Sequence, residues 1–225
     1  MVRENITDYF TLQLSFNGTG HTFSINAIFD ILEIIPSLKP FVTDIGHDTL
    51  FNITIDDTIT PSWSGSRVGT FPCPSATFEV YRQDDGAYII LVSDENETPC
   101  AFIRSDAERR NFTITTRGKE KEVTFGINNS IMLAYTMCTA AHKTLLMHSS
   151  VIENKGKAYM FLGASGRGKS THSDLWVKHI SGSKLINDDN PVVRVAPDGT
   201  PIVYGSPWSG KRPVYMNVHL SLIHI

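Results

Sequence analysis

Apolar and polar residues alternate along most of the first 126 positions, with the two-residue period of strands that pack one face against a core. Turn-forming residues interrupt the alternation, as at Asp84-Asp85-Gly86, where glycine tolerates the positive φ of a hairpin turn. The pattern predicts an antiparallel, β-rich region over residues 1–127. Its clearest expected strands are residues 11–16, 49–55, 77–81, 88–93, 112–116 and 122–126, and residues 28–35 favour a short helix.

The hydrophobic period changes after residue 127. Apolar residues then recur at helical spacing behind two capping candidates, Asn128 and Asn129, which predicts a helix over residues 130–143. Two apolar runs follow, residues 145–153 and 157–162, and the turn residues 154–156 indicate that they form a hairpin. We therefore expect a second domain over residues 128–225, in which a strand ends directly at a glycine-rich loop.

That loop matches the phosphate-binding pattern G-x-x-x-x-G-K-[ST] at every fixed position. Glycines let the backbone wrap around phosphate oxygens, and the helix expected over residues 169–179 adds the positive end of its dipole. Lys169 would reach the β and γ phosphates, and the Ser170 hydroxyl would ligate magnesium. Arg167 is either a second cation at the phosphates or a solvated side chain. The residues expected to bind the nucleotide are Gly163, Ala164, Ser165, Gly166, Arg167, Gly168, Lys169, Ser170 and Thr171.

An acidic pair, Asp188-Asp189, ends the strand expected over residues 184–187. In an α/β sheet, ligands collect at the carboxyl ends of strands, so these carboxylates would face the glycine loop. One aspartate suits a magnesium ligand beside Ser170, and the other suits a base that accepts the proton of an attacking hydroxyl. The alternative is a polar turn, since Asn190 and Pro191 follow. Beside a phosphate loop we favour the functional interpretation.

Three features together resemble the superfamily of HPr kinase/phosphorylase and phosphoenolpyruvate carboxykinase: His148 in the strand before the loop, the glycine loop, and an aspartate pair soon after it. Residues 204–211 also look like the G-x-P-W-S-G-K stretch of kinase-like members of unassigned substrate. The resemblance implies ATP and Mg²⁺ as cofactors, with Asp188, Asp189, Lys169 and His148 as the catalytic group. His148 would lie near the metal or the γ-phosphate, or be a strand histidine with a structural hydrogen bond.

By the same resemblance, residues 208–211 would form a loop over the acceptor or the nucleotide. Thr171 stands where HPr kinases carry glutamate, and the segments specific to the phosphorylase and to oxaloacetate binding are not recognisable. We therefore expect a phosphotransferase that acts on a hydroxyl of a protein or a small molecule. The alternatives are a carboxykinase-like enzyme and a regulatory module that binds ATP without turnover.

The fold class expected from these patterns is α+β to α/β, a β-rich region followed by an α/β P-loop nucleotide-binding domain. Only 75 residues follow Ser150. Because α/β nucleotide domains are usually longer, we expect this one to be incomplete.

The composition of the chain limits the classes of binding partner that we expect. Hydrophobic residues make up 41% of the chain and charged residues 19%, and the formal net charge of -3 leaves no basic excess. We therefore expect neither nucleic acid nor an anionic membrane as a partner. No run of 18 apolar residues occurs and the N-terminus is polar, which predicts a cytoplasmic protein. The three cysteines are far apart and without metal-ligand spacing, so reduced thiols are expected.

Overall fold

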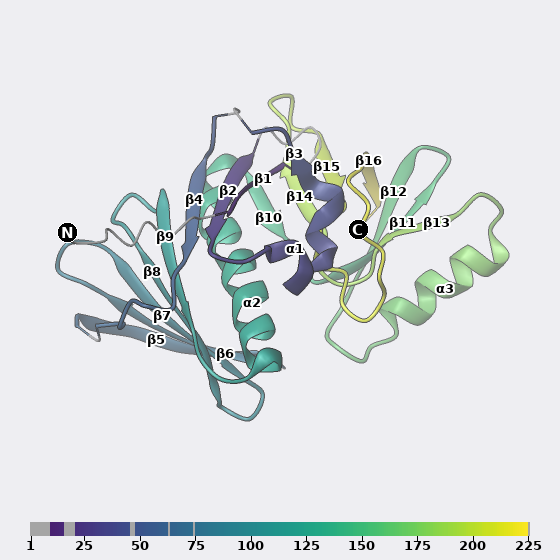
Figure 1. The fold of residues 1–225 in the computed structure, drawn as a ribbon. Coiled ribbons are helices and arrows are strands. Elements are labelled where there is room, and N and C mark those ends of the chain that lie inside the picture. The colour runs from purple at the N-terminus through teal and green to yellow at the C-terminus, as the bar shows by residue number, and fades with distance from the viewer. Residues whose placement is uncertain (1–9, 16–20, 46–47, 63, 74, 225) are drawn as a thin grey trace. The chain divides into compact units, whose positions relative to one another are not determined.

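The computed structural model describes residues 10–15, 21–45, 48–62, 64–73 and 75–224, which fall into two compact units (Figure 1). The first unit extends to Ala134 but excludes residues 15, 21 and 37–42, which belong to the second unit together with residues 135–224. The division therefore falls inside helix α2 (Glu120–Thr139), as does the expected boundary between residues 127 and 128. The chain passes from one unit to the other within a continuous helix.

The first unit is built on a nine-stranded mixed sheet in the order β3-β1-β2-β4-β9-β8-β7-β6-β5. Strand β4 pairs in parallel with β2 and β9, whereas the strands from β9 to β5 pair antiparallel. The strands are β1 (Phe10–Ser15), β2 (Thr22–Ala27), β3 (Val42–Thr43), β4 (Phe51–Ile55), β5 (Ser66–Pro72), β6 (Ala76–Arg82), β7 (Tyr88–Asp94), β8 (Pro99–Ser105) and β9 (Asn111–Thr116). The expected purely antiparallel pairing of this region is wrong, because a long connection through α1 (Ile31–Ile34) and a 3₁₀ helix (Pro36–Phe41) permits parallel pairing of β2 and β4.

The local strand predictions for this region are correct where alternation is strong. Residues 77–81, 88–93 and 112–116 lie in β6, β7 and β9, and Gly86 takes a positive φ of 85° in the expected turn between β6 and β7. Residue 16 of the first expected strand lies outside the described residues. The sequence pattern misses β2, β3, β5 and β8.

Helix α2 replaces a strand that the sequence pattern predicts over residues 122–126. The carboxylate of Glu122 accepts a hydrogen bond of 2.9 Å from the backbone N–H of Lys119, which is the kind of contact that starts a helix. A β-carbon on Gly126 would lie 2.7 Å from the carbonyl oxygen of Cys100 in β8. Glycine therefore lets α2 approach the sheet closely, and this packing overrides the short alternating pattern.

The second unit contains a seven-stranded sheet in the order β10-β14-β15-β16-β12-β11-β13, with one helix, α3 (Lys169–His179), packed against β11, β12 and β13. Every neighbouring pair is antiparallel except β12 and β16. The strands are β10 (Thr144–Leu146), β11 (Ser149–Asn154), β12 (Lys157–Leu162), β13 (Lys184–Asn187), β14 (Val192–Val195), β15 (Pro201–Tyr204) and β16 (His219–His224). Val151, Ala158, Met160, Ile186 and Val203 form the buried core cluster of this unit.

The expected α/β P-loop domain is wrong as a fold class. Such a domain has a mainly parallel sheet whose connections are helices, whereas β11 and β12 and also β14 and β15 are joined by short turns that force antiparallel pairing. The described residues of the second unit contain only one α-helical crossover, from β12 through α3 to β13, and antiparallel β11 lies between these two strands. The unit is a predominantly antiparallel sheet with a single helix on it.

The hairpin expected at residues 154–156 is confirmed, with Asn154 paired to Lys157 and positive φ values at Lys155 and Gly156. The single strand expected over residues 145–153 is instead two strands, β10 and β11. The break falls at Met147 and His148, so the His148 side chain is not part of the alternation of either strand. No helix in the described residues is long and apolar enough to cross a membrane.

His21 is a buried histidine of the second unit, with 4% of its surface exposed. The hydroxyl of Thr144 donates to the carbonyl oxygen of His142 at 3.1 Å, so its oxygen accepts from Nε2–H of His21 at 2.9 Å. Burial, followed by the nearby Arg194 and His142, lowers the pKa of His21 to about 4. The fold therefore holds this ring neutral.

We expect His21 to make stability depend on pH between about 6.5 and 4. In this range the unfolded state binds the proton and the folded state does not, so the free energy of unfolding falls as pH falls. The loss approaches about 3 kcal/mol at pH 4, from about 1.4 kcal/mol per pH unit. Urea unfolding of His21→Gln should show a flatter profile than the wild type, whereas the exposed His179→Gln should keep the wild-type slope. Parallel profiles for wild type and His21→Gln would contradict this assignment.

Candidate functional site

The glycine loop connects β12 to α3, as the sequence predicts. β12 ends at Leu162 and α3 begins at Lys169. Gly166 and Gly168 have φ values of 75° and 84°, and nothing lies within 4 Å of a β-carbon built on either. Glycine is therefore required at these two positions by backbone conformation rather than by space.

The ammonium group of Lys169 has three acceptors in this loop region. It donates to the carbonyl oxygens of Gly163 (2.8 Å) and Ala164 (3.2 Å), and it lies 3.0 Å from Nε2 of His148. Because an ammonium can only donate, Nε2 of His148 accepts, and the ring proton is on Nδ1. The three N–H donors of the lysine are thus matched by three acceptors.

His148 joins the lysine to the acidic pair. Its Nδ1 lies 3.0 Å from Oδ1 of Asp189, so the Nδ1 proton deduced above is donated to that carboxylate. The contact forms because the β10–β11 break places His148 next to Asp189, whose backbone carbonyl also accepts the N–H of Ser149 at 2.9 Å. The structure thereby brings together three of the residues predicted from the sequence: Lys169, His148 and Asp189.

Asp188 follows β13 and lies deeper, with 6% of its side chain exposed. Its Oδ1 accepts from the Ser150 hydroxyl at 2.6 Å, and Ser150 is 2.6 Å from the equally buried Ser173 of α3. Its Oδ2 lies 3.0 Å from Nε of Arg212, and Nη2 of the same guanidinium contacts Asp174 of α3 at 2.6 Å. These contacts connect β11, α3 and the chain after β15 around one carboxylate.

Sequence reasoning missed Arg212, Ser150 and Ser173. The G-x-P-W-S-G-K stretch, residues 204–211, stops one residue before Arg212. A basic residue directly after this glycine-containing stretch was nevertheless a signal that could have been used. Ser150 and Ser173 carried no signal, because serines of this kind are common and only their contact with Asp188 distinguishes them.

The chain after β15 packs tightly on the acidic segment. A β-carbon on Gly210, where φ is +60°, would lie 2.9 Å from the β-carbon of Asp189. The backbone N–H of Asp188 donates to the Ser209 hydroxyl at 3.1 Å. Trp208, which we expected in a loop over a ligand, is instead 4% exposed, with its ring centroid 5.7 Å from that of Tyr135. The Trp208 side chain therefore packs in the interior of the unit.

The two carboxylates differ in their surroundings. The side chain of Asp189 is 33% exposed, and its Oδ2 has no hydrogen-bond partner among the described residues. Partial burial raises the pKa of Asp189, an effect that the neighbouring His148 and Lys169 oppose. Asp188, in contrast, has both oxygens bonded to protein groups.

The oxygen donors of Ser170, Asp188 and Asp189 are of the type that Mg²⁺ prefers. Within the described part of the chain, no three His, Cys, Asp or Glu side chains are grouped so as to hold a metal by themselves. This donor set still fits magnesium, which is commonly held by one or two carboxylates together with substrate phosphates and water. Arg212 contacts both the Ser170 carbonyl oxygen, at 3.3 Å, and Asp188, which keeps these two candidate ligands in one region.

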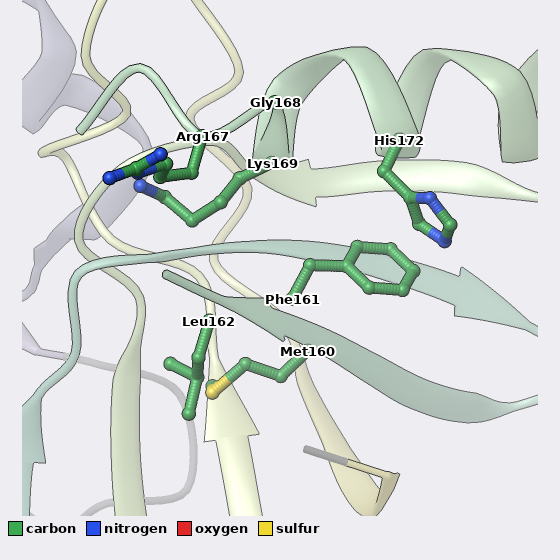
Figure 2. A pocket seen from close by; sticks show the side chains of 7 residues that line it. All are labelled: Met160, Phe161, Leu162, Arg167, Gly168, Lys169 and His172. Carbon is green, nitrogen blue, oxygen red and sulfur yellow. The ribbon is translucent and has the colours of Figure 1, made fainter. Parts of the chain in front are cut away.

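A cavity of about 480 Å³ opens beside the glycine loop (Figure 2). Its walls are the end of β12, the last residues of the loop and the first turn of α3. The lining residues are Met160, Phe161, Leu162, Arg167, Gly168, Lys169 and His172. It has the size of a small-molecule site.

No family model matches the chain, and no curated protein matches it significantly. The resemblance to the kinase and carboxykinase superfamily therefore rests on the motif residues of the sequence alone.

We expect Arg212→Ala to lower the free energy of unfolding by about 2–3 kcal/mol, because it leaves the buried carboxylate of Asp188 without its counter-ion. The comparison is Arg104→Ala, which removes an ion pair of 2.8 Å with Asp85 in which both side chains are more than half exposed. That change should cost less than about 1 kcal/mol. Chemical unfolding of both variants measures the difference, and equal losses would mean that Asp188 does not need Arg212.

Proposed function

We propose that the chain is an ATP- and magnesium-dependent phosphotransferase that transfers the γ-phosphoryl group to a hydroxyl acceptor of a protein or a small molecule. The observation that carries this proposal is the hydrogen-bonded path from Lys169 through His148 to Asp189. It links the lysine of a phosphate-loop pattern to a carboxylate of the acidic pair. A phosphotransferase needs both groups at the same phosphoryl group.

The loop supplies the binding of the phosphates. Its backbone N–H groups and the amino end of α3 favour anions, and the positive φ values of Gly166 and Gly168 are compatible with a loop that curls around them. Phosphate oxygens would replace the carbonyl oxygens of Gly163 and Ala164 as acceptors for Lys169. The lysine would then hold the β and γ phosphates by charge-assisted hydrogen bonds.

The differences between the two aspartates suggest their roles. Asp189 has an oxygen without a protein partner, a raised pKa and a histidine that orients it, which are properties of a general base for the acceptor hydroxyl. Asp188 and Ser170 are both tied to Arg212 and would hold the magnesium ion. When bound, the ion would neutralise charge on the β and γ phosphates.

We expect Lys169→Ala to reduce phosphoryl transfer by roughly 100-fold to 1000-fold, the scale for loss of one preorganised electrostatic group. Lys178→Ala is the control, because Lys178 is an exposed lysine in the last turn of the same helix. Transfer from γ-labelled ATP is measured with free serine, glycerol and seryl peptides as acceptors. Wild-type rates in the Lys169 variant would rule out the proposed role of the loop.

We expect Asp188→Asn combined with Asp189→Asn to abolish transfer while changing metal-free ATP affinity little, since the phosphates are held by the loop and Lys169. Removing two anions next to a polyphosphate reduces repulsion, so metal-free affinity can rise. Asp198→Asn, at an exposed turn of the same unit, is the matched control.

ATP titrations with and without magnesium, run beside the transfer assay, separate the possible outcomes. Normal transfer by the double variant would show that the two carboxylates take no part in the reaction and would overturn their proposed roles. A requirement for oxaloacetate would indicate a carboxykinase, and wild-type binding without turnover on any acceptor would indicate an ATP-binding regulatory module.

A further inference from the structure

The cavity beside the glycine loop has two chemically different ends. Two cationic side chains, Arg167 and Lys169, lie at one end (Figure 2). The remaining side chains of the lining are apolar or aromatic: Met160, Phe161, Leu162 and His172. A ligand that fits both ends has an anionic group joined to a flat or apolar group.

The cationic end is short of anions. The guanidinium of Arg167 has no hydrogen-bond or ion-pair partner among the residues that the structure describes, and Arg167 lines the same cavity as Lys169 (Figure 2). Two like charges close together repel each other unless an anion lies between or beside them. This arrangement is compatible with a polyphosphate, and it agrees with the interpretation of Arg167 as a second cation at the phosphates.

The apolar end is partly open to solvent. Leu162 is 44% exposed although it lies directly before the loop. The ring of Phe161 meets the His172 ring edge to face at a centroid distance of 4.5 Å, and Nε1–H of Trp176 donates to Nε2 of His172 at 3.2 Å. The aromatic part of the wall is therefore fixed in place, while Leu162 offers free apolar surface.

The topology indicates which part of a nucleotide would lie here. On one side of β12 lies β11, and beyond it lies β13, which ends directly before Asp188 and Asp189. On the other side lies β16, which pairs with Lys157, Ala158 and Tyr159 of β12. Neither aspartate lines the cavity. If the γ-phosphate faces the aspartates, the nucleoside extends from the other end of the phosphate chain toward the cavity.

We propose that the cavity is the nucleoside subsite of the triphosphate, in which the base packs on Leu162 and the adjoining apolar wall. This inference rests on the proposed function for the position of the phosphates. Apart from the two cations, the only polar side chain in the lining is His172, and its Nε2 is already bonded to Trp176. A wall with so few hydrogen-bonding groups discriminates weakly between bases, so adenine and guanine nucleotides should both bind, with affinities within about tenfold of each other.

The test compares ATP, GTP and inorganic tripolyphosphate, which has the phosphates without a nucleoside, by calorimetric titration of the whole chain. We expect Leu162→Ala to weaken ATP and GTP by about fivefold, the scale for losing part of an apolar contact, and to leave tripolyphosphate binding unchanged. The control is Leu145→Ala, since Leu145 is 52% exposed in the same unit but does not line the cavity. It should alter none of the three affinities.

The results separate this subsite from the phosphotransferase proposal. ATP binding that Leu162→Ala leaves unchanged, or an equal loss for tripolyphosphate, would overturn the nucleoside subsite and leave the proposed function standing. A wild-type protein that binds neither ATP nor tripolyphosphate would overturn both. Selective loss of the two nucleotides supports the subsite even where no acceptor is phosphorylated, and thermal unfolding of Leu162→Ala confirms that the variant is folded.

Discussion

The carboxylate of Asp188 lies in the interior with 6% of its side chain exposed, and an anion in such surroundings requires neutralising and hydrogen-bonding partners. These partners come from separate parts of the chain: Ser150 from β11 and Arg212 from the segment after β15. Arg212 also holds Asp174, and Ser150 touches Ser173, so α3 is attached twice. The contacts that satisfy the Asp188 carboxylate therefore position α3, which follows the glycine loop, and β13, which precedes the two aspartates.

The parts of the site that could be predicted from sequence are those whose signals are local. An apolar run, three glycines and a lysine define the end of β12 and the start of α3, and both boundaries agree with the structure. The strand before Asp188 could be recognised for the same reason. The pairing of Asp188 with Arg212 could not, because it joins residues far apart in the sequence and follows from packing rather than from spacing.

The fold class of the second unit was mispredicted for a physical reason of the same kind. A strand pattern does not give the direction of its neighbours, which follows from the length and conformation of the connections. The turn between β14 and β15, where Gly199 has a φ of 89°, was not recognised, and with it two antiparallel strands were missed. The single β12–α3–β13 crossover, read alone, suggested a parallel sheet. In the first unit, the alternation of residues 122–126 predicted a strand where α2 forms. The close packing of α2 against the sheet at Gly126 overrides that local pattern.

The ammonium of Lys169 already has a full set of acceptors, two carbonyl oxygens and a histidine nitrogen. An incoming anion therefore exchanges contacts instead of adding them, and its net gain is the difference between the two sets. A lone phosphate or sulfate ion offers oxygens from one centre and cannot easily replace acceptors that approach from several directions. A chain of phosphates can, because its oxygens are spread along its length. On the proposed function, these internal contacts of Lys169 would therefore disfavour the binding of small anions, and they would also make a triphosphate bind more weakly than it would to a lysine without such contacts.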